Sequence, residues 1–157
     1  MDVLWQELSA GWRDGESLVR IAVRLVVAAV LGGLLGLERQ YEHKLAGVRT
    51  HMLVALGACL FTAAALLGGA SIDAATRVIQ GIAAGIGFVG GGTILKLTDR
   101  MEVRGLTTAA NIWLAAAAGV AVGAGRPAPA VLGTALALLI LYALGRFEHW
   151  CGWTRRP

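Results

Sequence analysis

The polar residues of this 157-residue chain that could bind a ligand fall into two blocks, at positions 38–51 and 99–111. If Arg49 and Arg104 face one cavity, their guanidinium groups favour an anion, whereas a path for a divalent cation needs carboxylates. For such a path the chain offers only Glu38, Asp99 and Glu102, all expected to be solvated. The candidate site residues are Glu38, Arg39, Arg49, Thr50, His51, Asp99, Arg104, Thr107, Thr108 and Asn111.

The sequence holds no arrangement typical of an enzyme or a metal centre. No nucleophile is paired with a base, and no group of His and Cys has metal-ligand spacing. The run Gly85–Gly90 matches the dinucleotide pattern GxGxxG, which also requires an acid about 20 residues further on. Position 110 is alanine, and the run lies in an apolar segment. We therefore expect no catalytic residue, no metal and no cofactor.

Apolar segments long enough to cross a membrane separate the polar blocks. Only 15% of the residues are charged, against about 25% in a typical soluble domain. Four stretches lack Asp, Glu, Lys and Arg, at 50–72, 78–95, 105–125 and 127–145, and a fifth at about 18–37 is interrupted only by Arg20 and Arg24. A bilayer core takes about 20 helical residues. The sequence predicts an all-α integral membrane protein with five transmembrane helices, and excludes a disordered chain, a nucleic-acid-binding protein and a cytosolic enzyme despite the net charge of +4.

The basic residues predict the orientation, because Lys and Arg in short loops stay on the cytoplasmic side. Nine of them lie in the segments 38–49, 96–104 and 146–156, and only four lie in the alternate segments. We expect an extracytoplasmic N-terminal segment at 1–17, a five-span domain at 18–146 and a cytoplasmic tail at 147–157. The apolar face shared by Val3, Leu4, Leu8 and Trp12 makes residues 1–17 either an interfacial amphipathic helix or a frayed terminus.

Glycine accounts for 22 residues, about twice the usual ~7%. Small residues let transmembrane helices touch, and the third span has two GxxxG pairs. We interpret this span as the central helix, packed on several sides. The alternative is a break at 90–92, where backbone groups turn toward a ligand. The predicted helix-packing residues are Gly81, Gly85, Gly87, Gly90, Gly91 and Gly92.

Polar residues inside a span are costly unless they have a partner. Arg24 is expected either to snorkel toward the outer surface or to line a cavity. Thr107 and Asn111 lie four residues apart at the start of the fourth span. With Thr108, they serve either to join neighbouring helices or to bind a ligand.

The first two spans and the next two form two copies of one unit. Each copy has a glycine-rich span, a basic loop and an arginine that opens the following span, so that Val48-Arg49-Thr50 matches Val103-Arg104-Gly105. Both copies run in the same direction. The expected architecture is two tandem parallel helical-hairpin repeats plus a fifth helix, with a site between the copies near the cytoplasmic end.

At these residues the sequence resembles the MgtC/SapB family of bacterial inner-membrane proteins. The matching blocks are Gly36-Leu-Glu38-Arg39, Gly47-Val-Arg49-Thr50-His51, Gly85-Ile-Gly87-Phe-Val-Gly90-Gly-Gly92-Thr and Val103-Arg104-Gly105-Leu-Thr107-Thr108-Ala-Ala-Asn111-Ile-Trp113. The resemblance implies a multi-pass plasma-membrane protein linked to growth in low magnesium, membrane energetics and, in pathogens, virulence. Many relatives carry a soluble cytoplasmic domain after the fifth span.

Two classes of function follow. The first is a non-enzymatic protein that acts by binding another membrane protein through its glycine-rich spans. The second is a small-ion or solute transporter with its site between the repeats near the cytoplasmic face. The expected partners are the lipid bilayer, a second copy of the chain (a dimer is favoured) and another inner-membrane complex, with no nucleic acid.

Overall fold

Five long helices form an up-and-down bundle. The computed structural model describes residues 3–4, 15–97 and 102–151. Its long helices are α2 (Gly15–Tyr41), α3 (Val48–Leu67), α4 (Ile72–Gly91), α5 (Leu106–Gly123) and α6 (Pro127–Trp150). Each of the five is long and apolar enough to cross a membrane. The prediction of five transmembrane helices is confirmed.

Both ends of the chain lie partly outside the described residues. The predicted interfacial helix at 1–17 therefore has no structural description beyond residues 3–4 and 15–17, and the last three of these already belong to α2. Helix α2 extends beyond the predicted span of 18–37 on both sides. Helix α6 likewise continues past the predicted span to Trp150.

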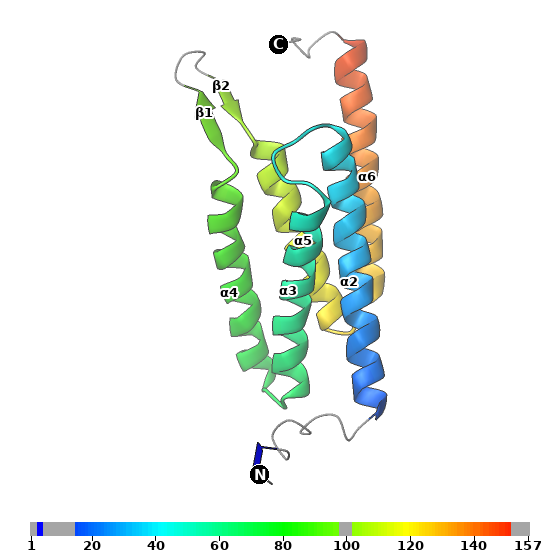
Figure 1. Ribbon diagram of the computed structural model, residues 1–157, viewed down its shortest axis with the longest axis vertical. Coiled ribbons are helices and arrows are strands. Elements are labelled where there is room, and N and C mark those ends of the chain that lie inside the picture. The colour runs from blue at the N-terminus through cyan, green and yellow to red at the C-terminus, as the bar shows by residue number, and fades with distance from the viewer. Residues whose placement is uncertain (1–2, 5–14, 98–101, 152–157) are drawn as a thin grey trace.

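The helices alternate in direction along the bundle. Figure 1 shows α2, α4 and α6 running toward one end and α3 and α5 running toward the other. The loop after α2, the connection between α4 and α5, and the end of α6 therefore share one end of the bundle (Figure 1). The three basic segments of the sequence come from these parts of the chain. We call this end the basic end.

Helix α3 is held between glycine-bearing faces of α2 and α5. A Cβ atom added at Gly36 of α2 would lie 2.6 Å from the Val48 Cα, and one added at Gly32 would lie 2.8 Å from the Ala55 Cβ. On the other side, an added Cβ at Gly119 of α5 would collide with the carbonyl group of Ala55. Such close approach supplies the van der Waals contact that holds helices together in lipid.

The central helix is α5, and α4 lies at the edge, which corrects the prediction made from the glycines of the third span. Helix α5 contacts each of the other four helices, and half of the residues in its membrane-spanning stretch are buried. In α4 only Ala75 and Gly90 are buried. An added Cβ would meet nothing within 4 Å at Gly81, Gly85, Gly87 and Gly91. The small-residue faces of α3 and α5 already pack against each other and against α2. These four glycines of α4 are therefore left without a neighbouring helix in contact.

The glycine triplet at 90–92 ends α4. The helix stops at Gly91, and the Thr93 hydroxyl donates a hydrogen bond of 2.7 Å to the Gly90 carbonyl. An added Cβ at Gly90 would touch Ala109 of α5 at 3.5 Å, whereas one at Gly92 would touch only carbonyl oxygens of α4. Of the six predicted packing glycines, Gly90 is the one that contacts another helix of the chain.

A short β-hairpin, absent from the all-α prediction, joins α4 to α5. Strand β1 (Leu95–Leu97) pairs antiparallel with β2 (Glu102–Arg104), so that Leu95 lies opposite Arg104. Gly105 then connects β2 to α5 with a positive φ of 96°, and a Cβ there would collide with the Thr93 carbonyl. Only glycine fits this junction. Strands of three residues are too short for an alternation of apolar and polar side chains to be recognised in the sequence of a charged loop.

Arg24 extends toward the end of the bundle opposite the basic end, the direction that the snorkelling alternative requires. Its Nη1 donates a hydrogen bond of 3.0 Å to the carbonyl oxygen of Gly123, the last residue of α5. A cation at this position satisfies a helix carbonyl that has no partner within the helix and complements the negative end of the helix dipole. Arg24 therefore ties α2 to α5 at the end opposite the basic end.

The close contact at Gly119 predicts a stability difference between two glycine-to-alanine variants. Gly119→Ala should cost about 1–3 kcal/mol, because the new methyl group collides with the Ala55 backbone. Gly133→Ala in α6 is the control, since its Cβ would meet nothing within 4 Å. Thermal unfolding in detergent measures both variants. Equal melting temperatures would show that α3 and α5 do not approach as closely as described.

Candidate functional site

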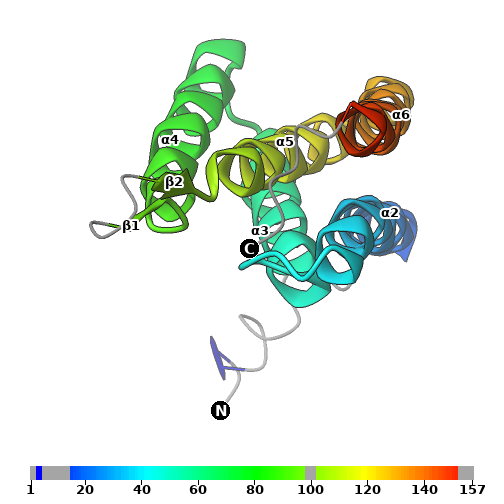
Figure 2. The same ribbon diagram turned by 90° about the horizontal axis from the view of Figure 1, so that it is seen from above.

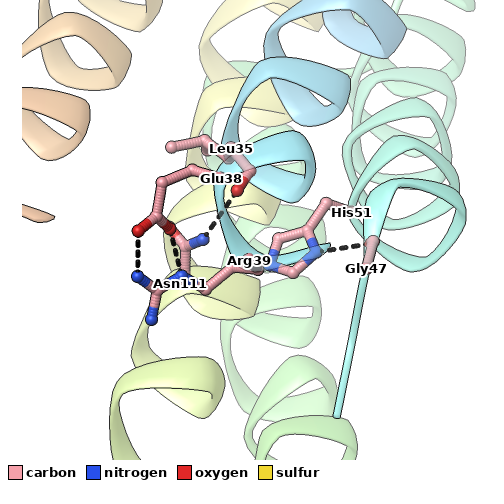
Figure 3. A network of polar contacts seen from close by, with 6 residues as sticks. All are labelled: Leu35, Glu38, Arg39, Gly47, His51 and Asn111. Carbon is pink, nitrogen blue, oxygen red and sulfur yellow. Dashed lines mark hydrogen bonds and ion pairs between the residues drawn. The ribbon is translucent and has the colours of Figure 1, made fainter. Parts of the chain in front are cut away.

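Four predicted site residues lie near the basic end and form what we call the polar cluster: Glu38, which is half-buried, and Arg39, His51 and Asn111, which are buried (Figure 3). Helix α2 supplies the first two residues from its last turns, α3 supplies His51 from its first turn, and α5 supplies Asn111. The cluster therefore lies where one helix of the second predicted repeat meets both helices of the first.

An ion pair forms one part of the polar cluster. Nε and Nη2 of Arg39 donate to the two carboxylate oxygens of Glu38. The Arg39 residue is 5% exposed, and the Glu38 side chain is 22% exposed. A buried guanidinium group is tolerated only when a counter-charge and hydrogen bonds accompany it. The pair therefore adds two charged groups without adding net charge.

His51 is fully buried, and only one of its ring nitrogens has a partner. Its Nδ1 lies 2.8 Å from the carbonyl oxygen of Gly47, the residue that caps the start of α3. A carbonyl can only accept, so Nδ1 carries the proton in this contact and Nε2 of the neutral ring is an acceptor. Nε2 has no hydrogen-bond partner among the described residues.

Asn111 joins α5 to α2. Its Nδ2 donates a hydrogen bond of 3.2 Å to the carbonyl oxygen of Leu35 (Figure 3). Asn111 is 4% exposed, and Thr108, one turn earlier on α5, is also buried. The interpretation of Asn111 as a residue that joins neighbouring helices agrees with this bond.

The other predicted site residues lie outside the polar cluster. Arg49, Arg104 and Thr107 are exposed, and Thr50 is half-buried. That Arg49 and Arg104 face one cavity stays a prediction, and the buried guanidinium group at this end of the described chain belongs to Arg39. Thr107 does not share the buried face of Asn111, which belongs to Thr108 instead. Asp99 lies outside the described residues.

Several contributors to this region were missed by sequence reasoning. The Leu35 and Gly47 carbonyls accept the hydrogen bonds of the cluster, and the Gln40 Oε1 accepts one of 3.4 Å from the Val48 backbone N–H. Backbone acceptors leave no signal in residue type. Gln40 could have been found as a polar residue placed to cap the start of α3.

The described part of the chain contains no group of three or more His, Cys, Asp or Glu residues that could hold a metal ion. Its two cysteines are free: Cys59 is buried and Cys151 is half-buried. The carboxylate of Glu38 is already engaged by Arg39. The polar cluster is therefore a poor ligand set for a hard divalent cation, which prefers several free oxygen ligands.

A separate apolar cleft of about 440 Å³ lies between α3 and α4, with Ala116 of α5 at its floor. Three glycines line it, and an added Cβ at any of them would meet nothing within 4 Å. No charged side chain lines it. The lining residues are Leu53, Val54, Gly57, Ala58 and Phe61 of α3, Val78, Gly81, Ile82, Gly85 and Ile86 of α4, and Ala116.

Comparison with known proteins identifies relatives of this chain. The model of the MgtC family matches residues 25–150. Protein SrpB of Synechococcus elongatus is 39% identical over 147 residues, covering 87% of this chain and 80% of SrpB. Protein MgtC of Brucella abortus is 45% identical over 124 residues, covering 78% of this chain and 50% of that protein. "Putative magnesium transporter YhiD" of Escherichia coli K12 is 38% identical over 126 residues, covering 76% of this chain and 58% of that protein.

The chain thus spans about half the length of the Brucella relative and four fifths of SrpB. No solved structure matches the chain.

The Glu38–Arg39 pair predicts that substitutions of the two residues have effects on the free energy of unfolding that do not add up. Glu38→Gln alone should destabilise the protein by about 3 kcal/mol, because it leaves the Arg39 charge buried without a counter-charge. The double variant Glu38→Gln/Arg39→Met should recover most of that loss, since neither charge remains. Glu42→Gln, at an exposed position on the same end, is the control. Thermal unfolding in detergent gives the comparison, and a double variant as unstable as the sum of the single variants would contradict the pairing.

Proposed function

The chain belongs to the MgtC family, and from this premise we propose that it is a non-enzymatic multi-pass protein of the bacterial plasma membrane that supports adaptation to low magnesium by binding other membrane proteins. In this proposal the basic end faces the cytoplasm and the N-terminus lies outside. The relative named "Putative magnesium transporter YhiD" supports the link to magnesium.

The apolar cleft between α3 and α4 carries the proposal of a binding function. It is open, glycine-lined and free of charged residues, so another transmembrane helix can approach the backbone closely. Van der Waals contact of this kind is the main source of helix association in lipid. The cleft is therefore better suited to a helix than to an ion.

The polar cluster supports the same conclusion. Its ion pair and its amide are satisfied within the chain, so they are not poised to replace the hydration shell of an ion. Their arrangement is that of a group that fixes α2, α3 and α5 relative to one another.

The alternative function is a transporter of a small ion or solute, with its site at the polar cluster. One observation favours it: the Nε2 of His51 is buried and has no partner among the described residues. A buried acceptor is costly unless a donor such as water or a protonated solute reaches it. The relative named as a magnesium transporter agrees with this class of function.

Growth and flux assays separate the two functions. We expect the chain to restore growth in low magnesium to a bacterium that lacks its own family member, while the purified chain in liposomes gives no more Mg²⁺ or anion flux than empty liposomes. Arg49→Ala and Arg104→Ala should each weaken growth without preventing membrane insertion, because both residues are exposed at the basic end. Reproducible flux above that of empty liposomes would favour the transporter instead.

Cysteine labelling tests the proposed orientation. Cys151, half-buried just beyond α6, should react with a membrane-impermeant maleimide only after intact cells are permeabilised. Arg126→Cys, exposed between α5 and α6 at the opposite end, should react in intact cells. Cys59 is buried and serves as the unreactive internal control. Labelling of Cys151 from outside would reverse the orientation.

A further inference from the structure

The two halves of the bundle are arranged alike except at one place. Seen from above, α3 and α5 occupy the middle, α2 and α4 lie on opposite sides of them, and α6 lies beside α2 and α5 (Figure 2). Helix α2 packs against both α3 and α5, and α4 likewise packs against both. The pair α2–α3 and the pair α4–α5 are therefore related by an approximate two-fold rotation, in which α4 takes the place of α2 and α5 takes the place of α3 (Figure 2).

The same rotation shows what the cleft lacks. Helix α6 covers the groove between α2 and α5, where its Ala130 packs in a cluster with Leu31 of α2, Val122 of α5 and, at the floor, Cys59 of α3. The equivalent groove lies between α4 and α3, with α5 at the floor. This is the apolar cleft, whose floor residue is Ala116. No helix in the described part of the chain covers it.

We propose that a second copy of this chain covers the cleft, so that the α3–α4 faces of two copies form a two-fold dimer. This proposal names a partner for the binding function proposed above and rests on it. The axis of the dimer lies along the membrane normal, so both copies keep the same orientation in the membrane.

The face carries both a large side chain and a hollow, as a self-complementary interface requires. Phe61 lines the cleft with a large side chain that is 65% exposed, whereas Gly57, Gly81 and Gly85 line it without side chains. Phe61 lies seven residues before the α3 cap Gly68, and Val78 lies seven residues after the α4 cap Ser71. Because the two helices are antiparallel, Phe61 lies level with Val78, one turn from Gly81. In a two-fold dimer each Phe61 therefore reaches the hollow beside the other copy's Gly81.

The α3–α4 face offers about three quarters of the area that each partner buries in a standard specific interface. Two adjacent helices of about 20 residues present roughly 30 Å by 20 Å, or about 600 Å² before side-chain relief is counted. Specific interfaces bury about 800 Å² per partner. In the single chain, only 6% of the residues in the membrane-spanning stretch of α4 are buried. Helix α4 would therefore gain most of the contact in the dimer.

Cross-linking in native membranes tests the interface. In a Cys59→Ala/Cys151→Ala background, Gly81→Cys should be joined into a covalent dimer by a short bis-maleimide. Leu136→Cys is the matched control, because both positions are the tenth residue of an exposed helix but lie on different sides of the bundle. Equal cross-linking of the two variants, as expected when lipid or an unrelated protein covers the cleft, would overturn the proposal.

A second variant separates dimer loss from unfolding. Gly85→Leu should weaken dimerisation about tenfold, measured by energy transfer between labelled copies in liposomes, because it fills the hollow. Its thermal midpoint in dilute detergent should not change, since the added side chain begins in open space. Gly133→Leu in α6 is the control and should dimerise normally. Unchanged dimerisation of Gly85→Leu would contradict the proposed interface.

The outcomes distinguish this proposal from the proposed function. Failure of the Gly81→Cys cross-link with normal growth in low magnesium overturns the dimer alone. Cross-linking of a chain that does not restore growth supports the dimer and overturns the function.

Discussion

The architecture depends on backbone-to-backbone contact between α3 and its two glycine-bearing neighbours. In lipid the hydrophobic effect does not drive helices together, so close contact must replace it. Gly32 and Gly36 on α2 and Gly119 and Gly123 on α5 let α3 approach from both sides. Larger residues at these positions would separate the helices and move apart the groups of the polar cluster, which come from all three.

The polar bonds between these helices lie at both ends of the contact. Asn111 joins α5 to α2 near the basic end, and Arg24 joins the same two helices at the opposite end. Between them the contact is apolar, and its buried residues include Ala28 and Leu31 of α2 and Val122 of α5. Hydrogen bonds specify the register of the helices, whereas the glycines and alanines supply the close packing. Helix α4 has neither of these bonds and only two buried residues, and therefore presents most of its surface outward.

The sequence predicts the five helices well because spacing between charges is a local property that lipid makes decisive. It also names the four members of the polar cluster as candidates, but it expects Glu38 to be solvated, whereas the Glu38 side chain is 22% exposed and is paired with Arg39. The partners themselves could not be predicted, because two of them are backbone carbonyls, of Leu35 and Gly47. The wrong placement of α4 has a related cause. A count of glycines shows that close approach is possible, but which glycine face meets a helix of the same chain depends on the three-dimensional arrangement.

The position of α5 has a consequence for biogenesis. Helix α3 needs α5 for its second face, yet α4 and the β-hairpin are synthesised between them. During insertion, α2 and α3 can pair first, while the other small-residue face of α3 stays exposed to lipid or to the insertion machinery. Helix α5 follows α4 in the chain and must therefore pack against α3 after α4 has been synthesised. The β-hairpin and its glycine junction provide the length and the sharp turn that let the nascent chain return to the centre of the bundle.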